Sequence, residues 1–151
     1  MENVDKTIEE AIIKFQIVML HLNKEIVEIV RETGLSNLLS REQIEAMRII
    51  KTEGKVTINE LAKLQNIFKT AASKRIAKLE EMGYVQRAYS ENKRIKLIKL
   101  SSEGESFLKK ATSVMTEAVK ERLGNKFTVD EVHQFVEQLT HIDSAFRENK
   151  Q

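Results

Sequence analysis

Basic side chains are concentrated in one short stretch of this 151-residue chain. Between Lys69 and Leu100 there are nine lysines and arginines against three glutamates, a net charge of +6. The rest of the chain carries −4, although the whole chain carries only +2. Ammonium and guanidinium groups form charge-assisted hydrogen bonds with phosphate oxygens, so this density of cations suits a polyanion. The stretch is therefore the first candidate for a binding surface, and duplex DNA is the indicated ligand.

The elements around this stretch predict how its cations are held. Two short helices, 58–65 and 69–82, follow one another across a tight connection at 65–68, as in a helix-turn-helix. We expect apolar inner faces, made by Leu61, Ala62 and Leu64 on the first helix and by Ala72, Ile76, Leu79 and Met82 on the second. The outer face of the second helix is small, hydroxylated or basic. Its predicted DNA-contacting residues are Lys69, Thr70, Ala71, Ser73, Lys74 and Lys78.

Such an outer face fits the major groove, because small residues let a helix approach the bases while hydroxyls and amines bond to base edges and phosphates. The alternative interpretation is an ordinary solvated helix face that happens to carry lysines.

A basic hairpin follows the second helix. Strands are predicted at 84–89 and 94–100, joined by the polar turn Ser90–Lys93. Three of its cations join the predicted DNA contacts, namely Arg87 and, at the tip of the hairpin, Lys93 and Arg94. Lys96 and Lys99 lie on the second strand. Such a hairpin is typical of the wing of a winged helix, which can place an arginine in the electronegative minor groove. The alternative is an edge hairpin whose lysines prevent aggregation; the order, spacing and charge favour the wing.

Capping boxes outline the remaining helices. Each pairs a hydroxyl residue with a glutamate or glutamine three positions on. The four pairs are Ser40 with Gln43, Thr57 with Glu60, Ser102 with Glu105, and Thr128 with Glu131. With the apolar periodicity they predict helices at 5–32, 41–52, 103–123 and 129–148, and a short strand at Lys55–Val56. The predicted fold is mainly α with a small β-hairpin wing (α+β). Its expected parts are an N-terminal dimerisation helix (1–35), a winged helix-turn-helix domain (36–101) and C-terminal dimerisation helices (102–151).

The first helix is apolar on more than one side. One stripe repeats in steps of three and four, through Ile8, Ile12, Phe15, Met19, Leu22, Ile26 and Ile29, and other apolar residues form a second face. A helix that is apolar on two sides must bury both, so we expect one face to pack on its own domain and the other to pack on a partner chain. The alternative is a central core helix in a monomer.

Two runs of sequence carry a family resemblance. The chain resembles the MarR family of winged helix-turn-helix regulators through "INELAKLQNIFKTAASKRIAKLEEMGYVQR" and "NKRIKLIKLSSEG". The resemblance implies a homodimer, formed by the first and last two helices, on a pseudo-palindromic site. In the family's Asp-x-Arg wing motif Arg94 is retained, but Asn92 replaces the aspartate that often orients the arginine. Phe68 stands where a capping serine is common, and Arg75 replaces an aliphatic residue and is expected to face DNA or a neighbouring acid.

Several other functions are not indicated. With no cysteine there are no disulfides or thiolate metal sites. His21, His133 and His141 lack ligand spacing, and no catalytic motif is present, so we expect neither an enzyme nor a metal or cofactor. The longest apolar run, 17–20, cannot span a membrane, and a cytoplasmic location is expected.

The sequence thus predicts a transcriptional regulator, a repressor, that binds its operator as a homodimer. A small lipophilic or aromatic effector is expected at Phe15, Met19, His21 and Leu22, with a core role for these residues as the alternative. The alternative function is a winged-helix protein that binds a protein partner instead of DNA.

Overall fold

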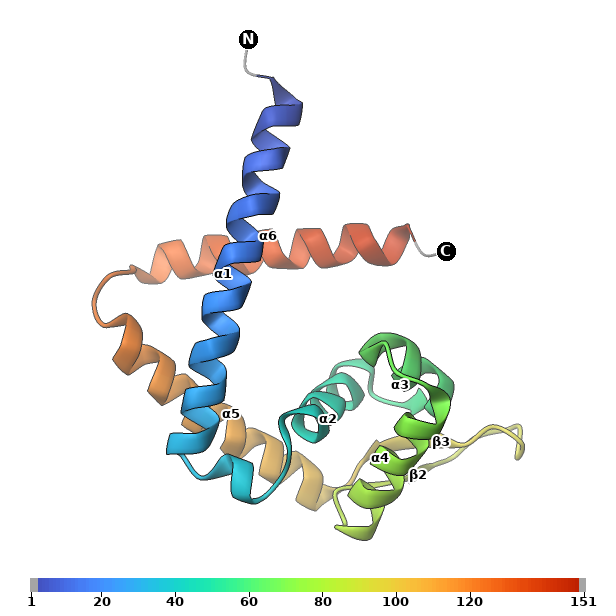
Figure 1. The fold of residues 1–151 in the computed structure, drawn as a ribbon. Coiled ribbons are helices and arrows are strands. Elements are labelled where there is room, and N and C mark those ends of the chain that lie inside the picture. Colours follow the sequence, from blue (N-terminus) through green and yellow to red (C-terminus); the bar gives the residue numbers. More distant parts are fainter. Residues whose placement is uncertain (1–2, 150–151) are drawn as a thin grey trace. The chain divides into compact units, whose positions relative to one another are not determined.

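The computed structural model describes residues 3–149 and divides after Met115 into two compact units. Figure 1 shows the elements in chain order: α1 (Val4–Glu32), the 3-10 turn η1 (Leu35–Asn37), α2 (Arg41–Glu53), β1 (Val56–Thr57), α3 (Ile58–Gln65), α4 (Lys69–Glu81), β2 (Val85–Ala88), β3 (Leu97–Leu100), α5 (Ser102–Leu123) and α6 (Val129–Glu148). Every helix predicted from the sequence is found, with ends that differ by at most one residue. The predicted fold class, mainly α with a small β-hairpin, is confirmed.

The sheet is small and antiparallel. Its strand order is β1-β3-β2, with Val56 opposite Ile98 and Val85 opposite Leu100. These four side chains are buried, whereas the alternate residues Leu97 and Lys99 are only partly so. Because side chains alternate between the two faces of a strand, one face of this sheet closes the core and the other remains accessible.

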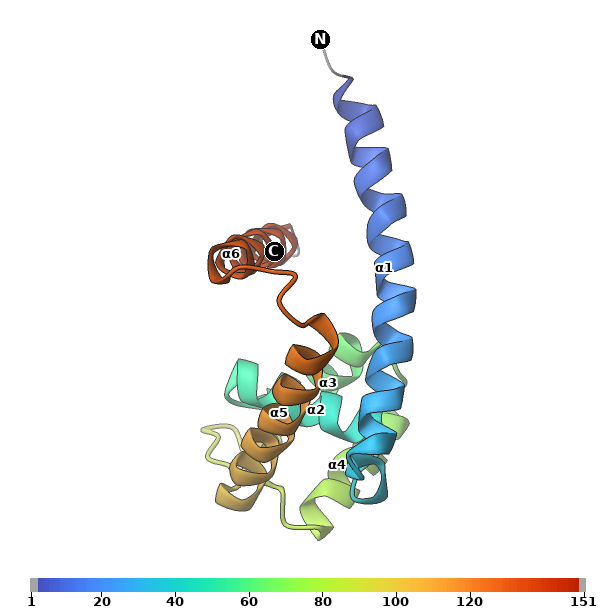
Figure 2. The same cartoon turned by 90° about the vertical axis from the view of Figure 1, so that its left-hand side faces the viewer.

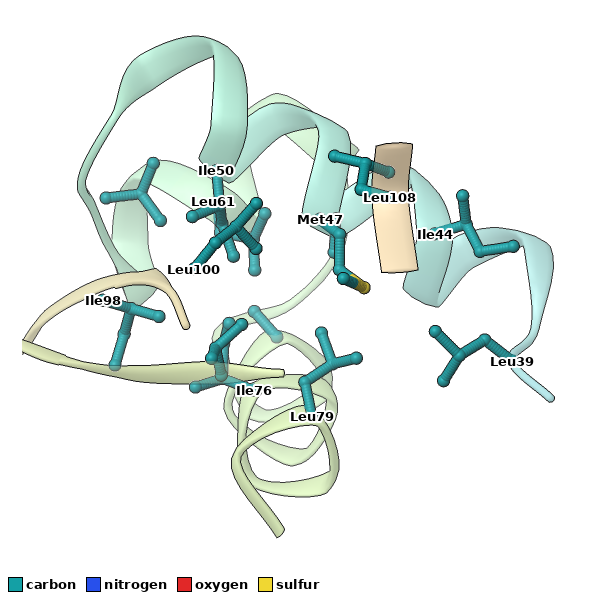
Figure 3. Close-up of a cluster of buried hydrophobic side chains, with 14 of the residues drawn as sticks. Leu39, Ile44, Met47, Ile50, Leu61, Ile76, Leu79, Ile98, Leu100 and Leu108 are labelled. Carbon is teal, nitrogen blue, oxygen red and sulfur yellow. The ribbon is translucent and has the colours of Figure 1, made fainter. Parts of the chain in front are cut away.

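The main core lies in the winged helix domain. Side chains from α2, α3, α4, the sheet and the beginning of α5 meet there (Figure 3). The largest fully buried members include Met47, Ile50, Leu61, Ile76 and Leu79. Burying each such side chain stabilises the fold by about 1.5–3 kcal/mol, so this cluster holds α4 firmly in place. The predictions for Leu64 and Met82 were wrong: both lie at helix ends, beyond the reach of the core, and are exposed.

A second cluster joins α1 to α5. Val30 and Leu35 pack with Ala111, and Phe107 contributes to both clusters. Only Ile29 and Val30 of α1 are buried, so the helix contacts its own unit through its last turns, and the rest extends beyond the winged helix domain (Figure 2). The preceding apolar residues of α1, from Ile8 to Leu22, are exposed.

The second unit consists of the end of α5 and α6. Its capping box is formed as predicted, with the Thr128 hydroxyl accepting the Glu131 N–H and the Glu131 carboxylate accepting the Thr128 N–H, both at 3.1 Å. Helix α6 has no buried residue in the described chain, although six of its side chains form an apolar stripe: Val132, Phe135, Val136, Leu139, Ile142 and Phe146.

The predicted box at Thr57 is half formed: within residues 3–149 its hydroxyl accepts the Glu60 N–H at 3.1 Å, and Glu60 returns no hydrogen bond to the Thr57 backbone. The predicted box at Ser102 is wrong. Helix α5 includes Ser102, and it is the hydroxyl of the preceding Ser101 that accepts the Gly104 N–H at 3.0 Å. Ser101 is buried, donates its hydroxyl to the Gly83 carbonyl and its backbone N–H to the Tyr84 carbonyl. These contacts tie the end of β3 to the turn after α4, which decides where α5 begins. Ser101 therefore takes the capping role expected of Ser102.

Gly104 provides a test of this junction. A Cβ at Gly104 would overlap the carbonyl oxygen of Tyr84, which itself accepts from Ser101. We predict that Gly104→Ala lowers the free energy of unfolding by about 1–3 kcal/mol or more, because backbone must move to admit the methyl group. The exposed neighbour Ser106, changed to alanine, should alter it by no more than about 0.5 kcal/mol. Urea denaturation measures both; equal stability for the two variants would contradict the packing.

Candidate nucleic-acid interface

The turn before α4 sets the direction of that helix. Asn66 ends α3 in the left-handed conformation, φ 54°, and the Ile67 N–H returns to the Ala62 carbonyl at 2.9 Å. Asparagine tolerates this conformation better than most residues. Ile67 then packs against the core, and the chain reverses into α4 at Phe68. The predicted helix-turn-helix is therefore formed, with α4 as its second helix.

Helix α4 has one buried and one exposed face. Ala72, Ile76 and Leu79 are almost completely buried, as predicted. The residues predicted to contact DNA all lie on exposed positions: Lys69, Thr70, Ala71, Ser73, Lys74 and Lys78. The exposed face of α4 thus consists of small, hydroxylated and basic side chains that are accessible to a ligand.

The hairpin has shorter strands and a longer tip than predicted. Its hydrogen-bonded turn lies at 92–95, where the Ile95 N–H donates to the Asn92 carbonyl at 3.0 Å, and not at 90–93. The Asn92 side chain accepts the Arg94 N–H at 3.0 Å, and the Ser90 hydroxyl donates to the Asn92 carbonyl. Short polar side chains compete in this way with strand pairing. Arg94 lies at the tip of the wing, as predicted, but outside the strand, which begins at Leu97.

Asn92 therefore has a structural role at the wing tip. It lacks the charge of the aspartate in the family motif, but its carboxamide oxygen holds the Arg94 backbone. The side chains of Lys93 and Arg94 are exposed, as is that of Arg87 on β2. The tip is ordered by neutral hydrogen bonds and leaves its cations available.

The wing is joined to α4. The Lys96 ammonium lies 3.4 Å from the Glu80 carboxylate, and both side chains are partly shielded from solvent. The hairpin leaves the sheet beside α4 in Figure 1, and β2 packs against that helix. The sequence predicted Lys96 as one more wing cation, but the structure uses it to connect the two elements that carry the predicted contacts.

Arg75 is a second connecting residue. Its guanidinium donates to the Gln65 carboxamide oxygen at 2.7 Å, and the Gln65 amide donates to the Glu45 carboxylate and to the Glu42 carbonyl of α2. Arg75 is only partly exposed. It was expected to face DNA or a neighbouring acid; instead, it reaches Glu45 through Gln65 and ties α4 to α3 and α2. The sequence offered no signal for Gln65, because its partner depends on how the helices cross.

Five of the candidate cations have no competing partner. Within residues 3–149, no carboxylate lies within 4.0 Å of the charged groups of Lys69, Lys74, Arg87, Lys93 or Arg94. Lys78 has only a 4.0 Å contact with Glu81 in the next turn of the same helix. Exposed pairs of that kind contribute little. The positive charge of α4 and of the wing tip is thus largely uncompensated.

The residues predicted to bind an effector lie on α1, outside the winged helix domain. Phe15, Met19, His21 and Leu22 are exposed on α1. A hollow of about 690 Å³ opens between α2 and α5. Leu108 forms part of its wall, and the charged groups around it belong to Arg48, Lys51, Lys109 and Glu105.

No group of histidines and carboxylates suited to a metal ion occurs in the described part of the chain, and His133 and His141 are exposed on α6. Of the helices in residues 3–149, none has the length and apolar character needed to cross a membrane.

Comparison with known proteins agrees with this geometry. Residues 39–104 match the winged helix DNA-binding domain family. An uncharacterised HTH-type transcriptional regulator of Bacillus subtilis, YdgG, is 33% identical over 114 residues, covering 72% of this chain and 73% of that protein. This chain belongs to the winged helix, HTH-type transcriptional regulators, and its motifs resemble those of the MarR family. The family consists of regulators and not of enzymes.

Solved structures share the fold. A MarR family protein from Bacillus stearothermophilus superposes with a TM-score of 0.73 at 18% identity, covering 97% of this chain and 99% of that one. A mutant MarR from E. coli in complex with operator DNA gives a TM-score of 0.60 at 20% identity, covering 87% of this chain and 95% of that one. The arrangement of helices and wing is therefore that of MarR proteins.

The contact between Arg75 and Gln65 can be measured directly. We predict a coupling free energy of about 1 kcal/mol in a double-mutant cycle with Arg75→Ala and Gln65→Ala, because the hydrogen bond involves a charged donor that is partly buried. The exposed pair Lys78 and Glu81, treated in the same way, should give less than about 0.5 kcal/mol. Chemical denaturation of the four proteins in each cycle provides the values. A coupling near zero for the first pair would show that Arg75 does not anchor α4.

Proposed function

We propose that this regulator represses transcription by binding a pseudo-palindromic operator as a homodimer. In the proposed complex α4 lies in the major groove and the tip of the wing lies in the adjacent minor groove. The observation that carries the proposal is the uncompensated positive charge on α4 and on the wing tip, two elements joined by the contact between Lys96 and Glu80. A polyanion is the partner that such a surface favours. A regulator of this kind works where the DNA is, and we propose the cytoplasm.

The candidate contacts divide by chemistry. Lys69, Lys74 and Lys78 suit phosphates on either side of the groove, whereas Thr70, Ala71 and Ser73 suit base edges. At the wing, Arg94 suits the minor groove, and Arg87 and Lys93 suit the flanking backbone. Phosphate contacts position the protein, and the few base contacts select the sequence.

The apolar faces of α1 and α6 support the dimer. Six large apolar side chains of α6 are 42–65% exposed within one chain, and those of α1 from Ile8 to Leu22 are similarly open. A helix with no buried residue gains little stability from its own chain, since most helical stability in proteins comes from packing an apolar face. A twofold partner that covers these faces would present two α4 helices about 34 Å apart, one turn of the duplex. Such a dimer would exclude other proteins from the DNA it covers, which is why we propose repression.

An effector would act through α2. The hollow between α2 and α5 has three cations, Arg48, Lys51 and Lys109, against one acid, Glu105, beside the apolar Leu108. We propose that it takes a small organic anion with an apolar body. Helix α2 is linked to α4 by Gln65 and Arg75, so displacement of α2 would be transmitted to the DNA-contacting helix. The predicted effector residues of α1 then have one of two roles in the dimer: they border the ligand bound by the partner chain, or they are buried in the dimer interface. These residues are Phe15, Met19, His21 and Leu22.

The salt dependence of DNA binding tests the surface. An operator is first selected from random duplexes with the full-length protein. We predict that Arg94→Ala weakens binding several-fold and lowers the slope of log K against log salt by about 0.9 for each phosphate that the arginine neutralises. Lys110→Ala, which removes an exposed cation outside the stretch 69–100, should leave the slope unchanged. An equal slope for wild type and Arg94→Ala would remove the wing from the interface, and no salt-dependent association at all would refute the function.

A charge in the apolar stripe of α6 tests the dimer. We predict that Phe135→Glu yields monomers in analytical ultracentrifugation and weakens operator binding at least tenfold, because a buried, unpaired carboxylate is costly and one half-site alone binds weakly. Gln134→Glu adds the same charge to a neighbouring exposed position outside the stripe, so it should remain dimeric. If Phe135→Glu sediments like the wild type, this face of α6 is not the interface.

A further inference from the structure

Phe68 is the most exposed large apolar side chain in the described part of the chain, with 85% of its surface accessible. It occupies the N-cap of α4, and its side chain makes no capping hydrogen bond there. A capping serine, threonine or asparagine would stabilise the helix by about 1 kcal/mol, so phenylalanine gives up a common source of local stability. Within residues 3–149 its ring belongs to neither hydrophobic cluster and makes no aromatic contact.

The turn fixes Phe68 in this position. Asn66 is held in the left-handed conformation and Ile67 packs against the core. Phe68 follows in an extended conformation, φ −70° and ψ 150°, and its carbonyl accepts the Ala72 N–H at 3.1 Å to begin the helix. The backbone of Phe68 is therefore anchored on both sides, and this fixes the position from which its exposed ring projects.

The surroundings of the ring indicate its partner. Phe68 is followed directly by Lys69 and Thr70, and Lys74 lies one turn further along the same exposed helix. An apolar protein surface would have to accept these cations without compensation. Duplex DNA offers both chemistries at once, because the major groove is lined by phosphates and carries one exposed apolar group, the C5 methyl of thymine.

We propose that Phe68 is a specificity-determining residue that contacts a thymine methyl group at one fixed position in each half-site. This inference rests on the proposed function and adds to it the base feature that is recognised. The N-terminal residues of a recognition helix are those that meet base edges, and phenylalanine is suited to the thymine methyl because the contact removes two apolar surfaces from water.

The experiment removes the methyl group and nothing else. In the operator selected with the full chain, each thymine is replaced in turn by deoxyuridine, at the symmetric positions of both half-sites. Deoxyuridine keeps the pairing and the hydrogen-bonding edge of thymine. For wild type we expect one symmetric position at which affinity falls about fourfold per half-site, the effect of losing one buried methyl group.

Variants assign that loss to the ring. Phe68→Ala should bind the thymine operator more weakly and show no further loss on uracil substitution at that position. Phe68→Leu should recover part of the discrimination, since it restores an apolar side chain. Leu64→Ala serves as the matched control, because Leu64 is also an exposed apolar residue of the helix-turn-helix, and it should keep the full uracil penalty.

Several results would overturn the inference. One is an operator in which no uracil substitution affects the wild type; another is an equal penalty for the wild type and Phe68→Ala. Loss of a defined protein complex on Phe68→Ala, with methyl-independent DNA binding, would assign the ring to a protein partner. In each case salt-dependent operator binding would persist and the proposed function would stand. Absence of DNA binding by the wild type would instead refute the function itself. Circular dichroism of each variant confirms that the fold is retained.

Discussion

The anchoring of α4 along one face is the constraint on which the rest of the structure depends. Ala72, Ile76 and Leu79 bury that face against the core, and the opposite face is left with small and basic side chains. A helix held only by its own propensity would fray at this length, since isolated helices shorter than about 12–15 residues are marginal in water. Packing makes the helix rigid enough to present a fixed set of groups, and a fixed set of groups is what sequence recognition needs.

Polar contacts then set the angle of this helix and of the wing. Arg75 and Gln65 connect α4 to α2, and Lys96 with Glu80 connects it to the hairpin. Burial decides which face of α4 points to the core, but because hydrophobic attraction is not directional it specifies the angle between α4 and its neighbours less sharply. Hydrogen bonds and ion pairs have preferred geometry, and they supply the orientation that burial does not. As a result, two basic residues of the stretch 69–100, Arg75 and Lys96, connect α4 to its neighbouring elements and are not among the proposed DNA contacts.

The winged domain and the helices outside it differ in how much of their apolar surface is buried within one chain. The winged domain has a continuous core and a sheet with one buried face. Helix α6 has a full capping box but no buried residue, and most of α1 is open. The first part is stabilised by its own chain, whereas the apolar faces of the second part are exposed within residues 3–149. The proposed dimer would cover those faces, and it would give one small domain access to two half-sites.

Much of this protein follows from local features of its sequence. Apolar periodicity, the boxes at Ser40 and Thr128, and the turn after Gln65 each depend on residues within a few positions of one another, and the helices lie where these signals predict. The charge of the stretch 69–100 and the apolar inner face of α4 are likewise legible from residue type and spacing, so the fold class and the helix-turn-helix were predictable.

Tertiary structure alone decided which side chains work together. Ser101 caps α5 in place of Ser102 because its hydroxyl also reaches Gly83, and Arg75 turns to Gln65 because α3 and α4 cross at that point. At the wing tip, the Asn92 side chain accepts the Arg94 N–H, so the strand predicted from position 94 begins only at Leu97. These outcomes depend on groups brought together by packing or on competition between local and long-range hydrogen bonds. Residue type and spacing determine the elements and their charge; the contacts between elements are decided only when the chain has folded.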